Sequence, residues 1–578
     1  MLSAKMTGFL VLVMTSLLTA HATDQFSPIV VTPSGPIKGV VVPALGQDVL
    51  QFRNIPYAKP PVGELRFRKP VPVEPWTETL DGRKFGPSCM QYKDLLEDVW
   101  DGLENKELSE DCLQLNVYVP RAVSTSDKKA VMVAIHGGSY LIGQAAADDP
   151  SFLALKDVIV VSINYRLGIF GFLSTGDDVI KGNFAIWDMI ESLKWVNRNI
   201  AAFGGDPDRV TVFGESAGGF ATSTLAVIPS NKGLFHRIIA QSGSVTSVMA
   251  FSRDPLRVTK AMAQQLGCIP DLEAAIDNTV LTECFQKKSP EELLEVSMDP
   301  TMNVEYLGYF ALRSILWPVV DGELFVEESV VSLRDPNSAV SAFYRSLDVI
   351  AGSTSNEGSL TMYMFHEHQE KMNFDLQQGI PTSVLCEVLG PAVARDMYGD
   401  ESLSDDICRE YTSNDQLQQS KNINYLYEDS CFVAPALQLV EFHSQGRTSS
   451  NTYHYVYSQE LSFTYMFPLP AWMEGLGAGH AMELPYLFGP ASQTDESLAT
   501  EEGRAFTDVL VSYWTNFAKT GNPNGGNLVP WKQFNTESRD YLELKFQPVQ
   551  GQNLYERRMN FLLRDLPNRQ QRNTKTEL

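Results

Sequence analysis

The segment Gly214-Glu215-Ser216-Ala217-Gly218 constrains the fold of this chain more than any other part of the sequence. It reads G-x-S-x-G, and the run before it, Arg209 to Phe213, has the β-branched and aromatic residues of a buried strand. The run after it, Gly219 to Val227, is typical of the start of a helix. Because the neighbouring backbone leaves no room for side chains in so sharp a turn, glycines beside the serine are required. The segment therefore predicts a strand–turn–helix unit that lifts Ser216 above a sheet.

The hydrophobic pattern of the first half alternates strands with helices. Ala130 to Ile135 and Val158 to Ile163 are apolar on both faces, as buried parallel strands are. Between Gly182 and Ala202 the apolar residues recur at helical spacing, directly before the strand that leads to Ser216. The pattern predicts an α/β fold with a large, mostly parallel central sheet flanked by helices.

The remaining strands place the loops that could surround Ser216. Asp348 to Gly352 and Thr452 to Tyr457 resemble further central strands, and residues 429–445 and 500–519 resemble helices. At the amino end, prolines punctuate the chain, so residues 37–42 and 48–52 are predicted as antiparallel edge strands. Ligands of open α/β sheets bind at the carboxyl ends of the strands. We therefore expect the loops after the central strands to meet beside Ser216.

One large domain is the organisation that the 578 residues favour, because no repeat or low-complexity linker divides them. Residues 1–22 contain an apolar stretch followed by Ala20-His21-Ala22, which is typical of a cleaved signal peptide. We expect a single domain over 23–565, a polar tail over 566–578 and no membrane span. The net charge of −24 argues against nucleic acid as a partner, and the oligomeric state stays open.

Seven cysteines follow the predicted signal peptide. The secretory route permits disulfides, but sequence alone fixes no connectivity, and an odd number leaves at least one thiol free or joined to another chain. The seven are Cys89, Cys112, Cys268, Cys284, Cys386, Cys408 and Cys431.

A base and an acid for Ser216 can be sought by chain order. A serine hydroxyl becomes nucleophilic when a histidine takes its proton and a carboxylate orients that histidine. In the predicted fold the order is serine, acid, histidine. His480, in G-A-G-H, lies in a loop after the strand at 452–457, and Glu357, in N-E-G-S, follows the strand at 348–352. The residues around Glu357 are equally compatible with a solvated surface glutamate.

Backbone donors for a developing oxyanion are predicted in two places. His136-Gly137-Gly138-Ser139 follows the buried strand at 130–135, where lipases and esterases carry a related glycine-rich motif. The N–H groups of Gly137, Gly138 and Ala217 would bind the tetrahedral oxyanion. This chemistry requires neither a metal ion nor an organic cofactor.

Four longer segments lie at 52–67, 109–120, 164–173 and 203–219. Together they resemble the type-B carboxylesterase and cholinesterase family of α/β-hydrolases, over nearly the whole mature chain. The resemblance implies a triad of Ser216, Glu357 and His480, with Glu215 and Ser242 as supporting residues. It also implies disulfides Cys89–Cys112 and Cys268–Cys284, whereas Asn560 stands where cholinesterases place the partner of Cys431. The four segments are F-R-N-I-P-Y-A-K-P-P-V-G-E-L-R-F at 52–67, S-E-D-C-L-Q-L-N-V-Y-V-P at 109–120, N-Y-R-L-G-I-F-G-F-L at 164–173 and F-G-G-D-P-D-R-V-T-V-F-G-E-S-A-G-G at 203–219.

Within this family the chain is closer to a carboxylesterase than to a cholinesterase. Residues 358–361 lack the aromatic residue that cholinesterases place after the acid, and 312–317 is poor in phenylalanine, which implies a wider, aliphatic acyl pocket. Trp100 resembles the choline-site tryptophan at a longer spacing, and we interpret it as lid packing. We predict a serine hydrolase of broad specificity that cleaves small-molecule carboxylic esters through an acyl-enzyme.

Three alternatives and two locations remain open from the sequence. A cholinesterase or a lipase of the same family would use the same residues, and relatives such as neuroligins keep the fold as non-catalytic adhesion proteins. The C-terminal Lys575-Thr576-Glu577-Leu578 resembles the K-D-E-L retrieval signal. It predicts retention in the lumen of the endoplasmic reticulum, with secretion as the alternative.

Overall fold

The computed structural model describes residues 28–92, 105–121, 124, 126–273, 277–297, 316–370, 372–446, 449–461, 470–488, 498 and 500–576. The predicted signal peptide, Trp100, most of the segment 312–317 and the last two residues of K-T-E-L lie outside these ranges.

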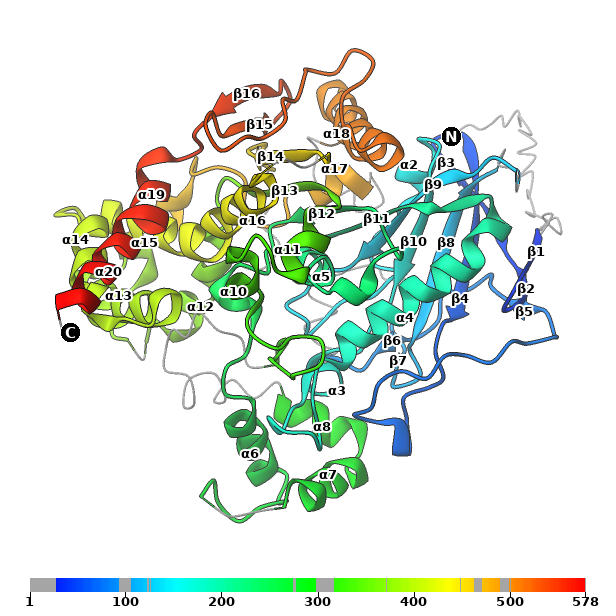
Figure 1. The fold of residues 1–578 in the computed structure, drawn as a ribbon, viewed down its shortest axis with the longest axis horizontal. Helices are drawn as coiled ribbons and strands as arrows, with labels where there is room; N and C mark the ends of the chain where they lie inside the picture. The colour runs from blue at the N-terminus through cyan, green and yellow to red at the C-terminus, as the bar shows by residue number, and fades with distance from the viewer. Residues whose placement is uncertain are drawn as a thin grey trace, which may run out of the picture.

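An eleven-stranded sheet forms the centre of the described part of the chain (Figure 1). Its seven inner strands, from β15 to β10, run parallel to one another, and the pairs at both margins are antiparallel. This arrangement confirms the predicted α/β class with a mostly parallel sheet. In spatial order the strands are β16 (Val549–Gln552), β15 (Asp540–Leu544), β14 (Thr452–Tyr457), β13 (Asp348–Thr354), β12 (Arg237–Gln241), β11 (Gly205–Glu215), β9 (Lys129–Ile135), β10 (Ile159–Ile163), β8 (Gln114–Pro120), β4 (Gln47–Pro56) and β3 (Val40–Ala44).

One predicted edge strand is divided. Residues 37–42 fall partly in β2 (Gly35–Lys38), which pairs with β1 (Ile29–Thr32), and partly in β3, which pairs with β4. The break is at Gly39, whose N–H donates to the Pro28 carbonyl at 2.8 Å. A side chain at Gly39 would meet the ring of Phe52 at 2.7 Å, so the chain changes partner where only glycine fits.

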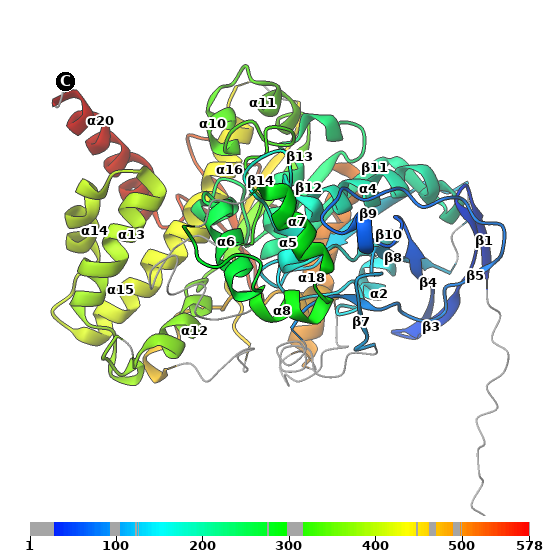
Figure 2. The ribbon, with the colours of Figure 1, turned by 90° about the horizontal axis from the view of Figure 1, so that it is seen from below.

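Helices cover both faces of the sheet (Figure 2). On one face lie α4 (Phe184–Asn199), α5 (Ala217–Leu225) and α16 (Ala434–Ser444), and on the other α2 (Ser151–Ala154) and α18 (Glu501–Thr520). The short helix α17 (Leu484–Phe488) shares the hydrophobic cluster of α2 and α18. Leu193 of α4 and Trp514 of α18 are fully buried in two separate hydrophobic clusters, one for each face. Burial of these apolar faces drives the layered packing, and the sheet separates the two cores.

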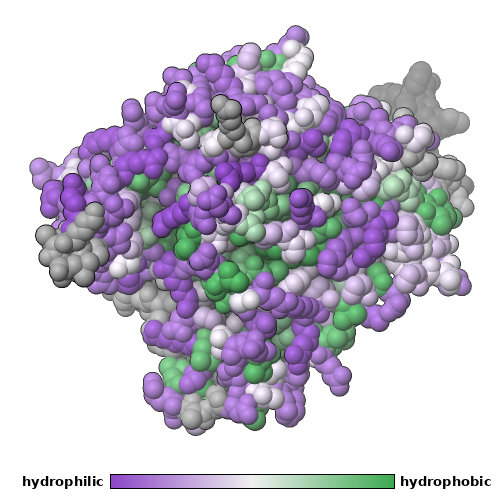
Figure 3. Space-filling model, in the orientation of Figure 1, coloured by the Kyte–Doolittle hydropathy of each residue, from purple (hydrophilic) through white to green (hydrophobic). Residues whose placement is uncertain are grey.

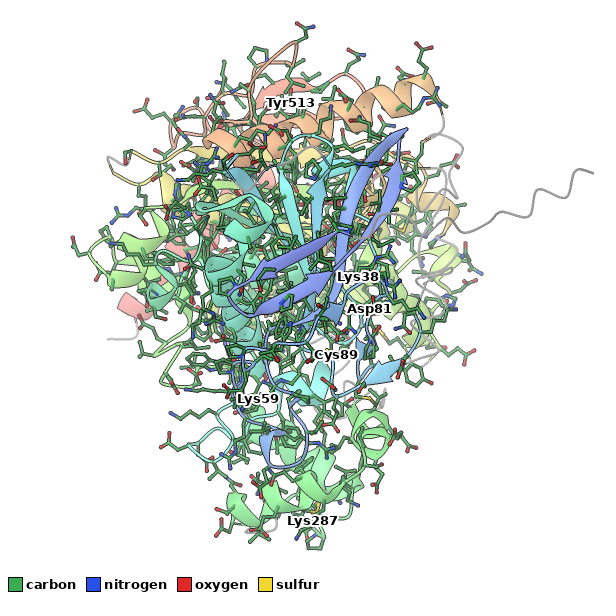
Figure 4. All side chains as sticks on the ribbon, turned by 90° about the vertical axis from the view of Figure 1, so that its right-hand side faces the viewer. Lys38, Lys59, Asp81, Cys89, Lys287 and Tyr513 are labelled. Carbon is green, nitrogen blue, oxygen red and sulfur yellow. A yellow bond between two sulfur atoms is a disulfide. The ribbon has the colours of Figure 1, made fainter. Side chains whose placement is uncertain are left out.

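Two long excursions leave the sheet at the carboxyl ends of β12 and β13. The first carries α6 (Pro255–Gln265), α7 (Asn278–Lys287) and α8 (Pro290–Ser297). Lys287 marks its outer end, at the opposite end of the molecule from Tyr513 of α18 (Figure 4). The second contains α12 (Ser359–His368), α14 (Ser404–Tyr411) and α15 (Gln416–Glu428). The helix predicted at 429–445 is the continuation of α15 through one π-helical turn, Asp429–Val433, into α16.

The C-terminal segment is helical and is held by ion pairs. After α19 (Glu556–Asn560), the predicted polar tail forms α20 over Leu566–Thr576, which ends at the outer edge of the molecule in Figure 2. Arg558 contacts the buried carboxylates of Glu428 at 2.9 Å and Asp429 at 3.1 Å. Removing the arginine would leave two buried carboxyl groups without their cation, which is costly in a low-dielectric interior.

Three disulfides join Cys89 to Cys112, Cys268 to Cys284 and Cys386 to Cys408, and Cys431 is a buried free thiol. The first two are the pairs that the family resemblance implies, and the third is one that the sequence left open. No helix in the described ranges has the length and apolar character to cross a membrane. The face in Figure 3 has a hydrophilic rim, with hydrophobic residues gathered towards its centre.

Candidate active site

Ser216 lies in the turn between β11 and α5 and has a backbone conformation that residues other than glycine rarely adopt. Its φ is 56° and its ψ is −126°, a strained combination that costs on the order of 1–3 kcal/mol. The turn is fixed by the Ser216 N–H, which donates to the Gln241 carbonyl at 2.9 Å. A side chain at Gly214 or at Gly218 would overlap the Ile135 carbonyl of neighbouring β9, so both glycines are needed for the close approach.

Glu357 and His480 come together from two neighbouring loops. Glu357 follows β13, is fully buried, and accepts a hydrogen bond from the Thr354 N–H at 2.7 Å. Its Oε2 lies 2.5 Å from His480 Nδ1. The loop that carries His480 is joined to the loop of Glu357 by a hydrogen bond from the Asn356 N–H to the Ala478 carbonyl, 2.9 Å long. The structure thus brings together the acid and the histidine that the sequence placed 123 residues apart.

The second ring nitrogen of His480 faces Glu215. The distance from His480 Nε2 to Glu215 Oε1 is 3.2 Å, and no hydrogen bond joins His480 to Ser216 among the described residues. The serine is nevertheless close by, because a side-chain carbon added at Gly137 would lie 3.0 Å from Glu215 Oε2 and 3.2 Å from Ser216 Cβ. Catalytic hydrogen bonds of this kind often form only when substrate is bound.

Buried carboxyl groups control the charge of His480. Burial lowers the pKa of His480, but the neighbouring Glu215, Glu357 and Glu483 outweigh burial and raise this pKa to about 9. Burial in turn raises the pKa of Glu215 well above its usual value, and raises that of Glu483 to about 7. The protonation of the imidazole is therefore set chiefly by these carboxyl groups.

Three residues of this cluster were not predicted from the sequence. Glu483 Oε1 accepts a hydrogen bond from Gln241 Nε2 at 3.2 Å, and Gln241 Oε1 accepts one from Trp514 Nε1 at 3.1 Å. Glu483 could have been found from its place three residues after His480, and Gln241 from its place at the end of a central strand. Trp514 lies on a helix far along the chain, and no local pattern connects it to the site.

Two of the three predicted oxyanion donors, Gly137 and Gly138, lie on a loop beside the elbow, and the third, Ala217, begins α5. The ring of His136 stacks on that of Tyr165, with centroids 4.3 Å apart, and the Tyr165 hydroxyl donates to the His136 carbonyl at 2.8 Å. The N–H groups of Gly137, Gly138 and Ala217 donate no hydrogen bond to any other described residue. They are therefore available to a substrate oxygen.

Ser242 lies at the end of β12, between the strands that lead to Ser216 and to Glu357. It is fully buried, its N–H donates to the Gly352 carbonyl at 2.9 Å, and its hydroxyl has no hydrogen-bond partner in the described part of the chain. Over the same residues, no group of three or more histidine, cysteine, aspartate or glutamate side chains is placed to hold a metal ion.

Comparison with known proteins agrees with this geometry. The profile of the carboxylesterase family matches residues 26–562. The pyrethroid hydrolase Ces2e of Rattus norvegicus is 34% identical over 94% of this chain and 91% of its own length. The cocaine esterase of Homo sapiens is 33% identical over 98% and 96%, and the medium-chain fatty acyl-CoA hydrolase precursor of Anas platyrhynchos is 33% identical over 95% of each chain. The chain therefore belongs to the carboxylesterase family and is a carboxylic-ester hydrolase with an α/β-hydrolase fold.

Proposed function

We propose that Ser216, Glu357 and His480 are the catalytic triad of this hydrolase. The observation that carries the proposal is the 2.5 Å contact between Glu357 and His480 Nδ1, next to a serine in a strained elbow. With Nδ1 occupied by the acid, the imidazole presents Nε2 towards the side of Glu215 and Ser216. The arrangement fits a base that is oriented on one nitrogen and takes a proton on the other.

The reaction then has two halves. His480 Nε2 accepts the Ser216 proton as Oγ attacks the ester carbonyl, and the N–H groups of Gly137, Gly138 and Ala217 stabilise the oxyanion. The alcohol leaves with the proton from Nε2, so an acyl group stays on Ser216. Water attacks this acyl-enzyme by the same route and releases the acid.

We further propose a broad specificity for small-molecule carboxylic esters. The relatives of similar identity are named for different substrates: a pyrethroid hydrolase, a cocaine esterase and a fatty acyl-CoA hydrolase. Relatives of similar identity are thus named for chemically different substrates, which supports a permissive substrate range for this chain.

The direct test is covalent labelling during turnover. Purified protein should hydrolyse p-nitrophenyl butyrate, and a fluorophosphonate should abolish the activity while adding its mass to the peptide that contains Ser216. Butyrylcholine and emulsified triglyceride, assayed in parallel, distinguish a carboxylesterase from a cholinesterase or a lipase. Folded protein that neither hydrolyses the ester nor takes up the label would favour the non-catalytic adhesion alternative.

Gly137→Ala should lower kcat by roughly 100- to 1,000-fold, the usual effect of losing one oxyanion donor. The added methyl would lie 2.8 Å from the Glu215 carbonyl and 3.2 Å from Ser216 Cβ, so the loop must move away from the elbow. The measurement is steady-state kinetics with p-nitrophenyl butyrate, with the thermal unfolding midpoint as the control for folding. An unchanged kcat in a folded variant would remove Gly137 from the proposed oxyanion hole.

Glu215→Gln should move the acid limb of the kcat/KM profile to lower pH. Glu215 is the foremost carboxyl group that raises the pKa of His480, and the amide carries no charge. The base must be neutral to accept the serine proton, so activity is lost as the pH falls through this pKa, and a lower pKa moves the loss to lower pH. Profiles from pH 5 to 10 for both proteins test this, and an acid limb that stays in place or rises would contradict it.

For the organisation of the chain we propose a single domain over 23–565 and passage through the secretory pathway. The three disulfides support that route, since such bonds persist in oxidising compartments. Retention in the endoplasmic reticulum through K-T-E-L is the finer proposal. Expressing the chain with and without residues 575–578 and measuring the secreted fraction tests it.

A further inference from the structure

A small cavity adjoins the oxyanion loop. Its volume is about 30 Å³, and it is lined by the carboxyl ends of β9, β10, β11 and β12, by residues 144–150 and by α17. Gly137 and Glu215 line it, and both also adjoin Ser216, whereas Ser216 and His480 are not part of its wall. The cavity is therefore next to the reacting groups but separate from them.

Polar side chains with unsatisfied atoms line this cavity. Gln144 is 3% exposed, and its buried Nε2 makes no hydrogen bond among the described residues. Glu215 is 5% exposed, and its Oε1 has His480 Nε2 as a neighbour at 3.2 Å but accepts no hydrogen bond in the same part of the chain. His136 also lines the cavity, and its buried Nε2 makes no hydrogen bond among the described residues. Buried donors and acceptors of this kind are normally satisfied, and where the protein offers no partner, water supplies it.

The size and chemistry of the cavity fit water. One water needs roughly 10–15 Å³ of such volume and two to four polar partners, so the space accommodates about two molecules. Asp148, also in the wall, adds a carboxyl group whose pKa is raised by burial to about 6.

The position of Glu215 connects the cavity with the base. Its Oε1 lies 3.2 Å from His480 Nε2 while the same side chain forms part of the cavity wall. A water molecule hydrogen-bonded to the Glu215 carboxyl group would therefore lie close to His480 Nε2, the atom that takes its proton. Gly137 also lines the cavity, but it packs closely on the elbow, since a methyl group there would lie 2.8 Å from the Glu215 carbonyl and 3.2 Å from Ser216 Cβ. The connection from the cavity to the base therefore runs through the Glu215 carboxyl group.

We propose that this cavity holds the water that hydrolyses the acyl-enzyme and supplies it by way of the Glu215 carboxyl group while the acyl group occupies the substrate pocket. The water oxygen bonds to the acyl carbon as its proton passes to His480 Nε2. The bond from that carbon to Ser216 Oγ then breaks, Oγ takes the proton back from Nε2, and the acid leaves. The inference depends on the triad proposed above.

A slow acyl group separates the two halves of the reaction. p-Nitrophenyl dimethylcarbamate would carbamoylate Ser216 with release of one nitrophenol, and after removal of the reagent, recovery of esterase activity reports attack by water alone. Ala145→Val fills part of the cavity, because Ala145 is buried in its wall. Ala146→Val is the matched control, since Ala146 does not line the cavity. Gln144→Met removes the polar amide while keeping the side-chain length.

In both cavity variants recovery should slow by about tenfold, as expected when an ordered water loses its partners, with carbamoylation unchanged. Ala146→Val should behave like the wild type in both steps. Equal slowing of carbamoylation and recovery, or unchanged recovery in Gln144→Met, would overturn the inference. If Ala145→Val does not fold, judged by its unfolding midpoint, Gln144→Met decides. Failure of the reagent to modify Ser216 in the wild type would instead refute the proposed triad.

Discussion

Ser216→Ala should lower kcat for p-nitrophenyl butyrate by roughly 10⁶-fold, because the nucleophile is the group whose loss removes the covalent route altogether. Residual hydrolysis by the oxyanion donors and by binding should stay above the uncatalysed rate. Alanine at position 216 keeps the backbone of the elbow and removes only the hydroxyl, so KM should change little. The measurement is steady-state kinetics with active-site titration, which excludes contamination by wild-type enzyme.

The control for this prediction is Ser192→Ala. Ser192 is also a buried serine, and its hydroxyl donates to the Met189 carbonyl within α4, remote from the elbow. Loss of a single such hydrogen bond should affect stability by about 1 kcal/mol and leave kcat unchanged. Activity of Ser216→Ala within about tenfold of the wild type would show that another group is the nucleophile.

Glu357→Gln should lower kcat by roughly 10⁴-fold, with KM nearly unchanged. The amide is nearly isosteric and its oxygen can still accept the hydrogen bond from the Thr354 N–H. It carries no charge to stabilise the imidazolium, and its NH₂ group, if it faces Nδ1, holds the wrong tautomer of His480. Kinetics with p-nitrophenyl butyrate measure the effect.

Two further variants make this second result interpretable. Glu357→Asp retains the charge on a shorter side chain and should recover part of the activity. Glu370→Gln alters an exposed glutamate in the same excursion and should have no effect. A fall of less than about tenfold in Glu357→Gln would mean that Glu215, on the other side of the imidazole, supplies the acid.

The fold was predictable wherever a pattern is local. The buried strands at 130–135 and 158–163, the strand at 452–457 and the helix at 500–519 have periodicities that burial alone enforces, and the structure contains all four. The break at Gly39 was not predictable, because it depends on the approach of Phe52 from a neighbouring strand. Nor was α15, whose polar sequence masks its continuity with α16 through the π-helical turn.

The candidate site likewise has features that the sequence predicts and features that only the folded structure reveals. Chain order and loop position made Glu357 and His480 candidates, but only the family resemblance favoured Glu357 over a surface glutamate. The structure places the two side chains in contact. The contact between Glu215 and His480 Nε2 could not be foreseen, since it depends on the direction of a side chain in the elbow. The hydrogen bonds from Trp514 through Gln241 to Glu483 link three elements that only the folded sheet brings together.

The two excursions from β12 and β13 have a consequence for how such an enzyme diversifies. They begin at the carboxyl ends of the strands, next to the proposed triad, yet they contribute no strand to the central sheet. Glu357 lies at the start of the second excursion, shortly after β13, so insertions, deletions or exchanges farther along the two excursions can reshape the space around the ester while Ser216, Glu357 and His480 stay fixed. Substrate specificity can therefore change through the excursions without any change in the residues proposed to carry out catalysis.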